Sequence, residues 1–354
     1  MKDKQRKLLA IWLYTGAGAI FIQIILGGIT RLTGSGLSIT EWKPLLGAIP
    51  PMNTAAWQQS FDLYKQIAQF KVVNASFSLE DYKAIYFWEW LHRNCARLIG
   101  YLFLIPFICL LFKGMISRKM FLKLTLLLTL GLLQALIGWI MVKSGLNDTA
   151  IAVSEIRLAI HFITAILLLA YTLWLAFDLS LPQLSLAVTM RHPTLNGIIL
   201  LVMLLQLFYG ALMAGSKAAL VAPTWPDMNG SFIPEALYHQ SADPHISYLL
   251  AIQSVHRMLA YLLTCLVLFQ YKKNITWKGR PYLSAVRIIP PILLVVQILL
   301  GIITLLDSFN ASYKIWGIIH QANGILLFGS LLLIFYINLN KRYNTQGFSL
   351  TPPF

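Results

Sequence analysis

Long apolar segments alternate with short polar segments along almost the whole chain. A helix needs about 20 consecutive apolar residues to cross the roughly 30 Å hydrocarbon core of a bilayer. Segments of that kind occur near residues 8–30, 85–112, 119–142, 155–177, 194–216, 246–271, 285–306 and 315–338. This pattern predicts an all-α integral membrane protein with about eight transmembrane helices.

The composition agrees with a membrane protein and excludes a soluble domain of this size. Of the 354 residues, 58% are hydrophobic and only 12% are charged. The net charge of +15 does not indicate nucleic-acid binding, because the Lys and Arg residues lie in short segments between apolar runs rather than in one patch. We expect membrane lipid, and no nucleic acid, around this chain.

The basic segments predict an orientation. They stand before the first apolar segment and after the second, fourth, sixth and eighth, which would place both termini in the cytoplasm. The first apolar segment has no cleavage site, so we expect a retained helix. Only seven residues precede that segment, too few for a transit peptide, which favours a bacterial inner membrane over a mitochondrial one.

The chain contains an internal repeat, in which segments 1 to 4 resemble segments 5 to 8. Glu89-Trp-Leu-His92-Arg93 in the second segment matches Gln253-Ser-Val-His256-Arg257 in the sixth. An even number of spans per repeat gives both halves the same orientation. We expect two pseudo-symmetric four-helix bundles, formed by residues 1–178, with an outer-side loop subdomain at 31–84, and by residues 194–340. The aromatic residues of that loop suit an interfacial lid, namely Trp42, Trp57, Phe61 and Tyr64.

A Gln-x-x-x-Gly motif occurs once in every odd-numbered segment, as Gln23/Gly27, Gln134/Gly138, Gln206/Gly210 and Gln297/Gly301. Small residues let membrane helices approach closely, and an amide can hydrogen-bond across the contact. We interpret the motif as helix packing; direct contact of a glutamine with a cofactor is the alternative.

Four histidines lie one in each even-numbered segment: His92, His161, His256 and His320. Each is about six to nine residues from the outer start of its segment, which is roughly 9–14 Å deep. A single buried histidine usually bonds neighbouring helices. Four at one depth, paired by the repeat, instead indicate a functional site.

Two imidazoles from separate helices are the ligand set that haem iron takes on its two faces. Each half could then hold one haem, with Arg93 and Arg257 near the propionates, although snorkelling to the interface would also explain these arginines. A di-iron site fits poorly, because only Glu89/His92 has the required spacing. A zinc site would not explain the pairing by halves.

The two halves differ at one buried position, where Glu89 in the first corresponds to Gln253 in the second. A buried carboxylate is costly unless it serves proton chemistry or stabilises charge. We therefore expect the N-terminal half to perform chemistry and the C-terminal half to hold a carrier haem. An ion pair with Arg93, one turn on, is the structural alternative for Glu89.

Several stretches together resemble the haem A synthase family of bacterial and mitochondrial membrane enzymes. They cover nearly the whole chain and comprise Gly27-Gly-Ile-Thr-Arg-Leu-Thr-Gly-Ser-Gly-Leu37, Glu41-Trp-Lys-Pro44, Glu89-Trp-Leu-His-Arg93, Ala159-Ile-His161, Thr224-Trp-Pro226, Val255-His-Arg257 and Ile319-His320. Some bacterial members carry a cysteine pair in outer loops, which this sequence lacks, so redox regulation through such a pair is not predicted.

The resemblance implies oxidation of a methyl group of haem O, through an alcohol, to the formyl group of haem A for terminal oxidase assembly. It implies molecular oxygen and an external electron donor as co-reactants, with haem O synthase as a candidate partner. By carry-over, Glu89, His92 and His161 mark the substrate haem site, and His256 and His320 ligate the iron of a resident haem b. The sequence leaves a homo-oligomer open.

Two other functions remain as alternatives at this point. A di-haem b-type membrane electron-transfer protein would use the same four histidines, but would need no difference between the halves. A transporter with parallel repeats would place its polar groups beside broken helices. No even-numbered segment has a Gly or Pro break beside its histidine, which disfavours the transporter.

Overall fold

The computed structural model describes residues 3–41, 46–181, 192–238, 243–277 and 281–339. Its long helices are α1 (Asp3–Leu32), α4 (Leu79–Phe112), α5 (Arg118–Lys143), α6 (Glu155–Ser180), α8 (Pro193–Ser216), α9 (Pro244–Lys273), α10 (Pro281–Leu306) and α11 (Tyr313–Leu339). All eight are long and apolar enough to cross a membrane. The predicted number of spans is therefore confirmed.

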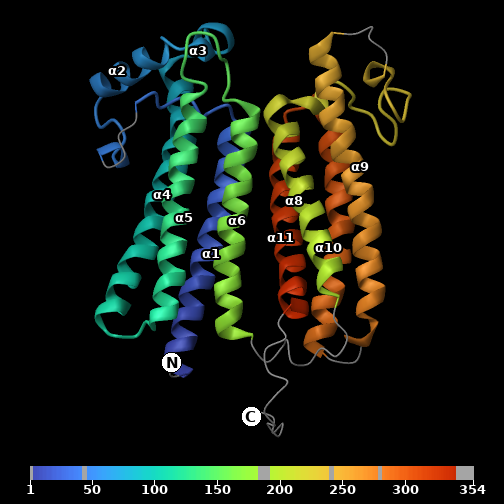
Figure 1. The fold of residues 1–354 in the computed structure, drawn as a ribbon. Helices are drawn as coiled ribbons and strands as arrows, with labels where there is room; N and C mark the ends of the chain where they lie inside the picture. Colours follow the sequence, from blue (N-terminus) through green and yellow to red (C-terminus); the bar gives the residue numbers. More distant parts are fainter. Residues whose placement is uncertain (1–2, 42–45, 182–191, 239–242, 278–280, 340–354) are drawn as a thin grey trace, which may run out of the picture.

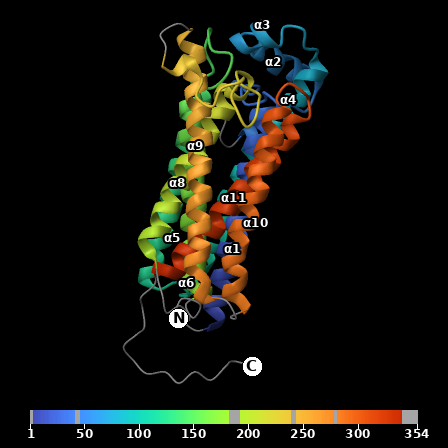
Figure 2. The same cartoon turned by 90° about the vertical axis from the view of Figure 1, so that its right-hand side faces the viewer.

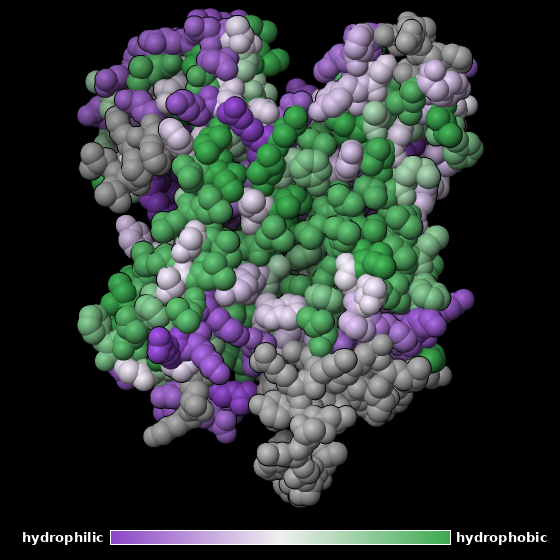
Figure 3. All heavy atoms as spheres, in the orientation of Figure 1, coloured by the Kyte–Doolittle hydropathy of each residue, from purple (hydrophilic) through white to green (hydrophobic). Residues whose placement is uncertain are grey.

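The surface agrees with a membrane-spanning molecule. An apolar belt crosses its middle, and hydrophilic residues gather above and below that belt (Figure 3). The long helices run side by side along the same direction (Figures 1 and 2). The start of α1 and the end of α11 lie at the same end of the molecule (Figure 1). That this end faces the cytoplasm stays a prediction.

The helices form two groups, with α1, α4, α5 and α6 on one side and α8, α9, α10 and α11 on the other (Figure 1). In the first group, α1 packs against α4 and α6, and α5 packs against α6 and α4. In the second, α8 packs against α9 and α11, and α10 packs against α11 and α9. Each group is thus a ring of four helices, in which α4 lies diagonally opposite α6 and α9 diagonally opposite α11.

The largest buried core lies between the two groups rather than inside either of them. It combines Ile20 of α1, Ile166 of α6, Ile199 of α8 and Leu327 of α11, all nearly or fully buried. The two inner helices of one group pack against those of the other, with α6 on α8 and α1 on α11. One member of each diagonal pair, α6 or α11, therefore also packs against the other group.

A polar contact also joins the groups at this interface. Gln321, the residue after His320, donates from its amide to the carbonyl of Ile24 on α1, at 3.0 Å. A Cβ atom on Gly28 would overlap the end of the Gln321 side chain, which would have to shift to admit it. This contact ties α11 to α1 beside two of the histidine positions.

Helix α4 begins at Leu79, six residues before the apolar segment that predicted it at residue 85. A capping box fixes this start: the Ser78 hydroxyl and the Asp81 backbone N–H pair, and the Asp81 carboxylate accepts from Ser78. The first turns are polar and aromatic because they stand outside the apolar belt, so hydropathy alone does not detect them.

The outer subdomain contains the short helices η1 (Leu46–Ala48), α2 (Thr54–Tyr64) and α3 (Ala68–Val73). Phe61 and Tyr64 are buried and stack on Tyr82 of α4, with ring centroids 5.0 and 5.3 Å away. They form the core of this subdomain, and its role as an interfacial lid stays a prediction. Trp42 lies outside the described residues.

The opposite half has a smaller outer segment. It contains η2 (Ala218–Leu220) and η3 (Glu235–Leu237), while η4 (Asn274–Trp277) follows α9 at the other end. Within the described ranges the only extended pairing is a single bridge between Met228 and Ser231.

Replacing Tyr82 by alanine is expected to loosen the outer subdomain. The side chain is fully buried, and its loss leaves a cavity that costs about 3–5 kcal/mol. Limited proteolysis of membrane vesicles should then cut residues 46–73 faster. Val72→Ala is the control, because Val72 is 70% exposed. Equal cleavage rates of the two variants would contradict this account of the subdomain core.

Candidate functional site

The four predicted histidines lie on the diagonal helix pairs. His92 on α4 and His161 on α6 belong to one ring, and His256 on α9 and His320 on α11 to the other. Each of these pairs therefore comes from two diagonally opposite helices of one four-helix ring. The structure thus places together, within each half, the two histidines that were expected to serve one haem.

A glutamine of the neighbouring helix α1 contacts the imidazole of His92. Gln23 Nε2 of α1 lies 3.2 Å from His92 Nδ1 and donates to the His92 carbonyl at 3.0 Å. Four residues later, a Cβ on Gly27 would lie 3.2 Å from His92 Cε1. Gln23 and Gly27 therefore form a cradle, in which the amide holds the ring and the missing side chain makes room for it.

The same cradle recurs at the other three histidines. The amide nitrogens of the three glutamines lie 3.1 to 3.3 Å from a ring nitrogen, in the pairs Gln134–His161, Gln206–His256 and Gln297–His320. A Cβ on the matching glycine would meet the ring Cε1 at 2.8 Å for Gly138, 3.3 Å for Gly210 and 3.0 Å for Gly301. Every Gln-x-x-x-Gly motif thus receives one histidine.

The sequence correctly predicted that the glutamine of this motif forms a hydrogen bond between helices, but it did not predict that the bond reaches a histidine. The amide hydrogen bond across helices exists, and what it reaches in each case is the predicted ligand histidine. One motif in each odd segment, followed by one histidine in the next, was the signal available in the sequence.

These surroundings fit a haem better than a bare metal ion. A flat ring with axial ligands on both faces needs two imidazoles on opposing helices, which each ring of helices supplies. Among the described residues, no group of three or more His, Cys, Asp or Glu side chains could hold a metal ion. Buried polar atoms without a partner in the described chain also lie there, namely Gln23 Oε1, Gln206 Oε1 and His320 Nδ1.

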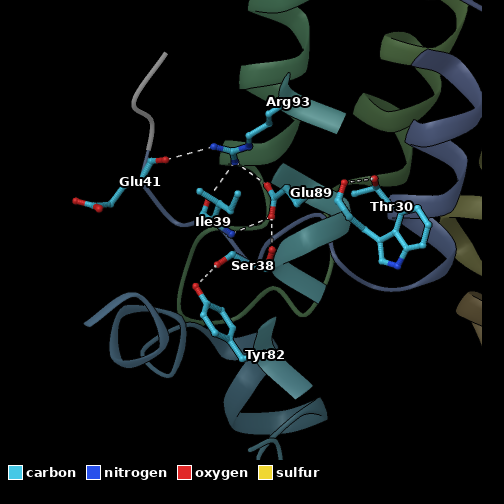
Figure 4. A network of polar contacts seen from close by, with 8 residues as sticks. Thr30, Ser38, Ile39, Glu41, Tyr82, Glu89 and Arg93 are labelled. Atoms are coloured by element: carbon cyan, nitrogen blue, oxygen red, sulfur yellow. Dashed lines mark hydrogen bonds and ion pairs between the residues drawn. The ribbon is translucent and has the colours of Figure 1, made fainter. Parts of the chain in front are cut away.

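Glu89 is 2% exposed and all its contacts are with its own half (Figure 4). Its Oε1 pairs with Arg93 at 2.7 Å, and its Oε2 accepts from the Ser38 hydroxyl at 2.7 Å and from the Ile39 N–H at 2.9 Å. The ion pair that was the structural alternative is therefore present. The partners in the outer segment were not predicted, because they are about 50 residues away in sequence.

Arg93 holds the same outer segment. It donates to the carbonyls of Ile39 at 3.0 Å and Glu41 at 3.3 Å, in addition to its bond with Glu89 (Figure 4). Arg93 and Glu89 together fix the main chain of residues 38–41 over the outer end of α4. The propionate contact expected for Arg93 stays a prediction.

Arg257 and Gln253 make the equivalent arrangement in the other half. Arg257 donates to the carbonyls of Thr224 at 2.7 Å and Asp227 at 2.8 Å, and Gln253 donates to that of Ala222 at 2.8 Å. Each half thus clamps the outer segment that follows its first helix. The clamp contains a carboxylate only in the N-terminal half.

Comparison with known proteins gives one consistent family. A family model described as "Cytochrome oxidase assembly protein" matches residues 10–332. A heme A synthase of Flavobacterium psychrophilum is 38% identical over 335 residues, covering 92% of this chain and 96% of the relative.

Two further relatives extend the likeness to other bacteria. A heme A synthase of Rhizobium rhizogenes is 37% identical over 335 residues, covering 93% of this chain and 89% of the relative. One of Parvibaculum lavamentivorans is 40% identical over 289 residues, covering 80% and 81%. With eight apolar helices and bacterial relatives, this is a multi-pass bacterial membrane protein. The chain belongs to the cytochrome oxidase assembly protein family that includes the bacterial haem A synthases.

Proposed function

We propose that this protein is a haem A synthase, which oxidises a methyl group of haem O to the formyl group of haem A. The observation that carries the proposal is the fourfold cradle, in which a glutamine amide from a neighbouring helix contacts one imidazole on each of the two diagonally opposite helices of each bundle. The names of the relatives give the reaction. This activity supplies haem A for assembly of a terminal oxidase.

The N-terminal bundle is the proposed substrate site. His92 and His161 would hold the iron of haem O, and the surrounding apolar helices would exclude water from it. Converting a methyl to a formyl group removes electrons and hydrogen from the substrate and adds oxygen. Molecular oxygen accepts these electrons, and the external donor supplies the further electrons that complete its reduction to water. Haem O synthase is the proposed source of the substrate.

Glu89 is the proposed acid–base group of this half. It lies on α4 three residues before His92, which places the two side chains next to each other on one face of the helix. Its carboxylate continues through Ser38 into the outer segment, so a proton that leaves the substrate has a polar route out of the apolar interior. The negative charge also offsets positive charge that develops on the ring.

The C-terminal bundle is the proposed site of a resident haem b between His256 and His320. When bound, this haem supplies a one-electron carrier. Gln253 replaces the carboxylate here and cannot ionise, which agrees with a carrier rather than a reacting site. A di-haem electron carrier without chemistry would leave the difference between Glu89 and Gln253 unexplained.

Haem extraction from the purified protein tests this proposal. In a host that makes haem O, the wild type should yield haem A, and His92→Leu and His161→Leu should yield none. His256→Leu and His320→Leu should lose the haem b absorbance. His245→Leu is the control, because His245 is exposed on the same helix as His256. A wild type that binds haem but produces no new haem species would favour the di-haem carrier and overturn the proposal.

A further inference from the structure

We propose that the four glutamines of the cradles are positioning residues for the axial histidines, and that each half contains one fixed and one adjustable cradle. This inference rests on the proposed binding of haem in each half. It assigns a role to the four helices that contribute no ligand themselves, α1, α5, α8 and α10. The division follows from what the glutamine side-chain oxygen contacts.

Two glutamines are fixed by a second hydrogen bond. Gln134 Oε1 accepts from the Thr164 hydroxyl at 2.6 Å, and Gln297 Oε1 accepts from the Asn323 amide at 2.7 Å. Thr164 and Asn323 each stand three residues after the histidine of the same cradle, on the same side of the helix. With the oxygen engaged, the amide nitrogen is the group that faces the imidazole.

The other two glutamines have no such second bond. Gln23 Oε1 and Gln206 Oε1 are buried and find no hydrogen-bond partner in the described part of the chain. The residues three positions after their histidines are Cys95 and Leu259. Leucine has no donor and a thiol is a weak one, so neither can fix the amide. These two amides can rotate without breaking a bond at the oxygen.

Iron ligation explains what such rotation achieves. A histidine that binds iron through Nε2 carries its proton on Nδ1 and needs an acceptor there, which is usually a carbonyl or carboxylate oxygen. In the adjustable cradles the glutamine nitrogen lies 3.2 Å from His92 Nδ1 and 3.3 Å from His256 Nδ1, and it lies 3.3 Å from Nε2 of each ring. Rotation of the amide replaces this nitrogen by the unpartnered oxygen, which then accepts from Nδ1–H. At Gln23 this new bond replaces the one that the amide nitrogen donates to the His92 carbonyl.

The two ligands of one haem therefore differ in character. His92 and His256 gain a carbonyl acceptor that makes the imidazole more electron-rich. The fixed amides instead keep their nitrogen toward the ring, at Nδ1 of His161 and at Nε2 of His320, so neither supplies an acceptor oxygen. A more electron-rich ligand stabilises ferric haem and lowers its reduction potential. The adjustable glutamine, rather than the fixed one, is thus expected to control the potential of each haem.

The C-terminal half offers a test that does not depend on haem A formation. The midpoint potential and the low-spin electron paramagnetic resonance signal of haem b are measured in purified full-length variants. Gln206→Glu should lower the potential, because a carboxylate is the stronger acceptor. Gln206→Leu should raise it, and Gln297→Leu should shift it less than Gln206→Leu does.

Gln321→Leu is the matched control. Gln321 is adjacent to His320, but its amide donates to the Ile24 carbonyl rather than to an imidazole, so the potential should not change. If Gln206→Leu releases haem, Gln206→Glu still reports the sign of the shift. Unchanged spectra and potentials in both Gln206 variants would overturn the positioning role, and equal shifts from Gln206→Leu and Gln297→Leu would overturn the division. A wild type without haem would instead overturn the proposed function.

Discussion

A Gly301→Ala variant should purify with little of its haem b, whereas Gly329→Ala should retain it. The new Cβ at position 301 would lie 3.0 Å from His320 Cε1 and 3.5 Å from His320 Nδ1. The imidazole must then shift away from α10 by a few tenths of an ångström, which displaces the proposed ligand nitrogen. A loss of about 1.4 kcal/mol in binding lowers haem affinity about tenfold.

The control separates this contact from a general effect of alanine. Gly329 lies on α11, and a Cβ there meets nothing within 4 Å. Both substitutions favour the helix by about 1 kcal/mol, so neither is expected to unfold the protein. The measurement is haem absorbance per mole of purified protein. Full haem content and an unshifted spectrum in Gly301→Ala would contradict the cradle.

The N-terminal half allows the same comparison on one helix. In Gly138→Ala the Cβ would lie 2.8 Å from His161 Cε1, while Gly131, two turns earlier on α5, has free space around it. Haem A formation should fall in Gly138→Ala and remain normal in Gly131→Ala. The Cβ contact with the imidazole is shorter at Gly138 than at the glycines of the other three cradles. We therefore expect the alanine substitution here to displace its histidine the most.

Glu89→Gln is expected to reduce haem A formation by about a hundredfold or more, the range in which a general acid or base contributes. Glutamine keeps an oxygen that can accept from Ile39, and Gln253 occupies the equivalent position in the other half. The substitution therefore removes the negative charge but leaves a side chain that can still hold the outer segment, as Gln253 does in the other half. Haem A and unreacted haem O in extracts give the measurement.

The matched control for this variant is Glu80→Gln on the same helix. The Glu80 side chain is 78% exposed and pairs with Lys83 on the surface, so haem A formation should stay normal. Protease cleavage of residues 46–73 distinguishes lost chemistry from a loosened outer segment. A Glu89→Gln variant that makes haem A at the wild-type rate would exclude an acid–base role for this residue.

Hydropathy alone was sufficient to predict the eight spans, since a bilayer of fixed thickness imposes a minimum length on every apolar segment. It failed at the start of α4, where Leu79 to Ala84 continue the helix beyond the apolar belt. That extension is stabilised by a cap and by aromatic packing with Phe61 and Tyr64, which are local and tertiary contacts without an apolar period.

The candidate site was predictable as a set of residues, but not as a set of contacts. The repeat identified His92 with His256 and His161 with His320 as equivalent residues, because duplication leaves equivalent residues at equivalent depths, and each half then contains one pair. The partners of Gln23 and of Glu89 depend on which helices and loops become neighbours, and neither Gln23–His92 nor Glu89–Ser38 has a signature in local sequence. The assignment of haem O to one half and haem b to the other stays a prediction.

The interface between the halves has the geometry of a two-fold dimer. The contact of α6 with α8 corresponds, under the repeat, to the contact of α11 with α1. Gln321 and Gly28 form one of these contacts, and Phe162 packs on the cluster around Ala211 at the other. Two copies of a half-length ancestor would have closed this same self-complementary surface. Identical subunits must carry the same residue at both sites, so joining them in one chain is what allowed a glutamate to remain in only one bundle.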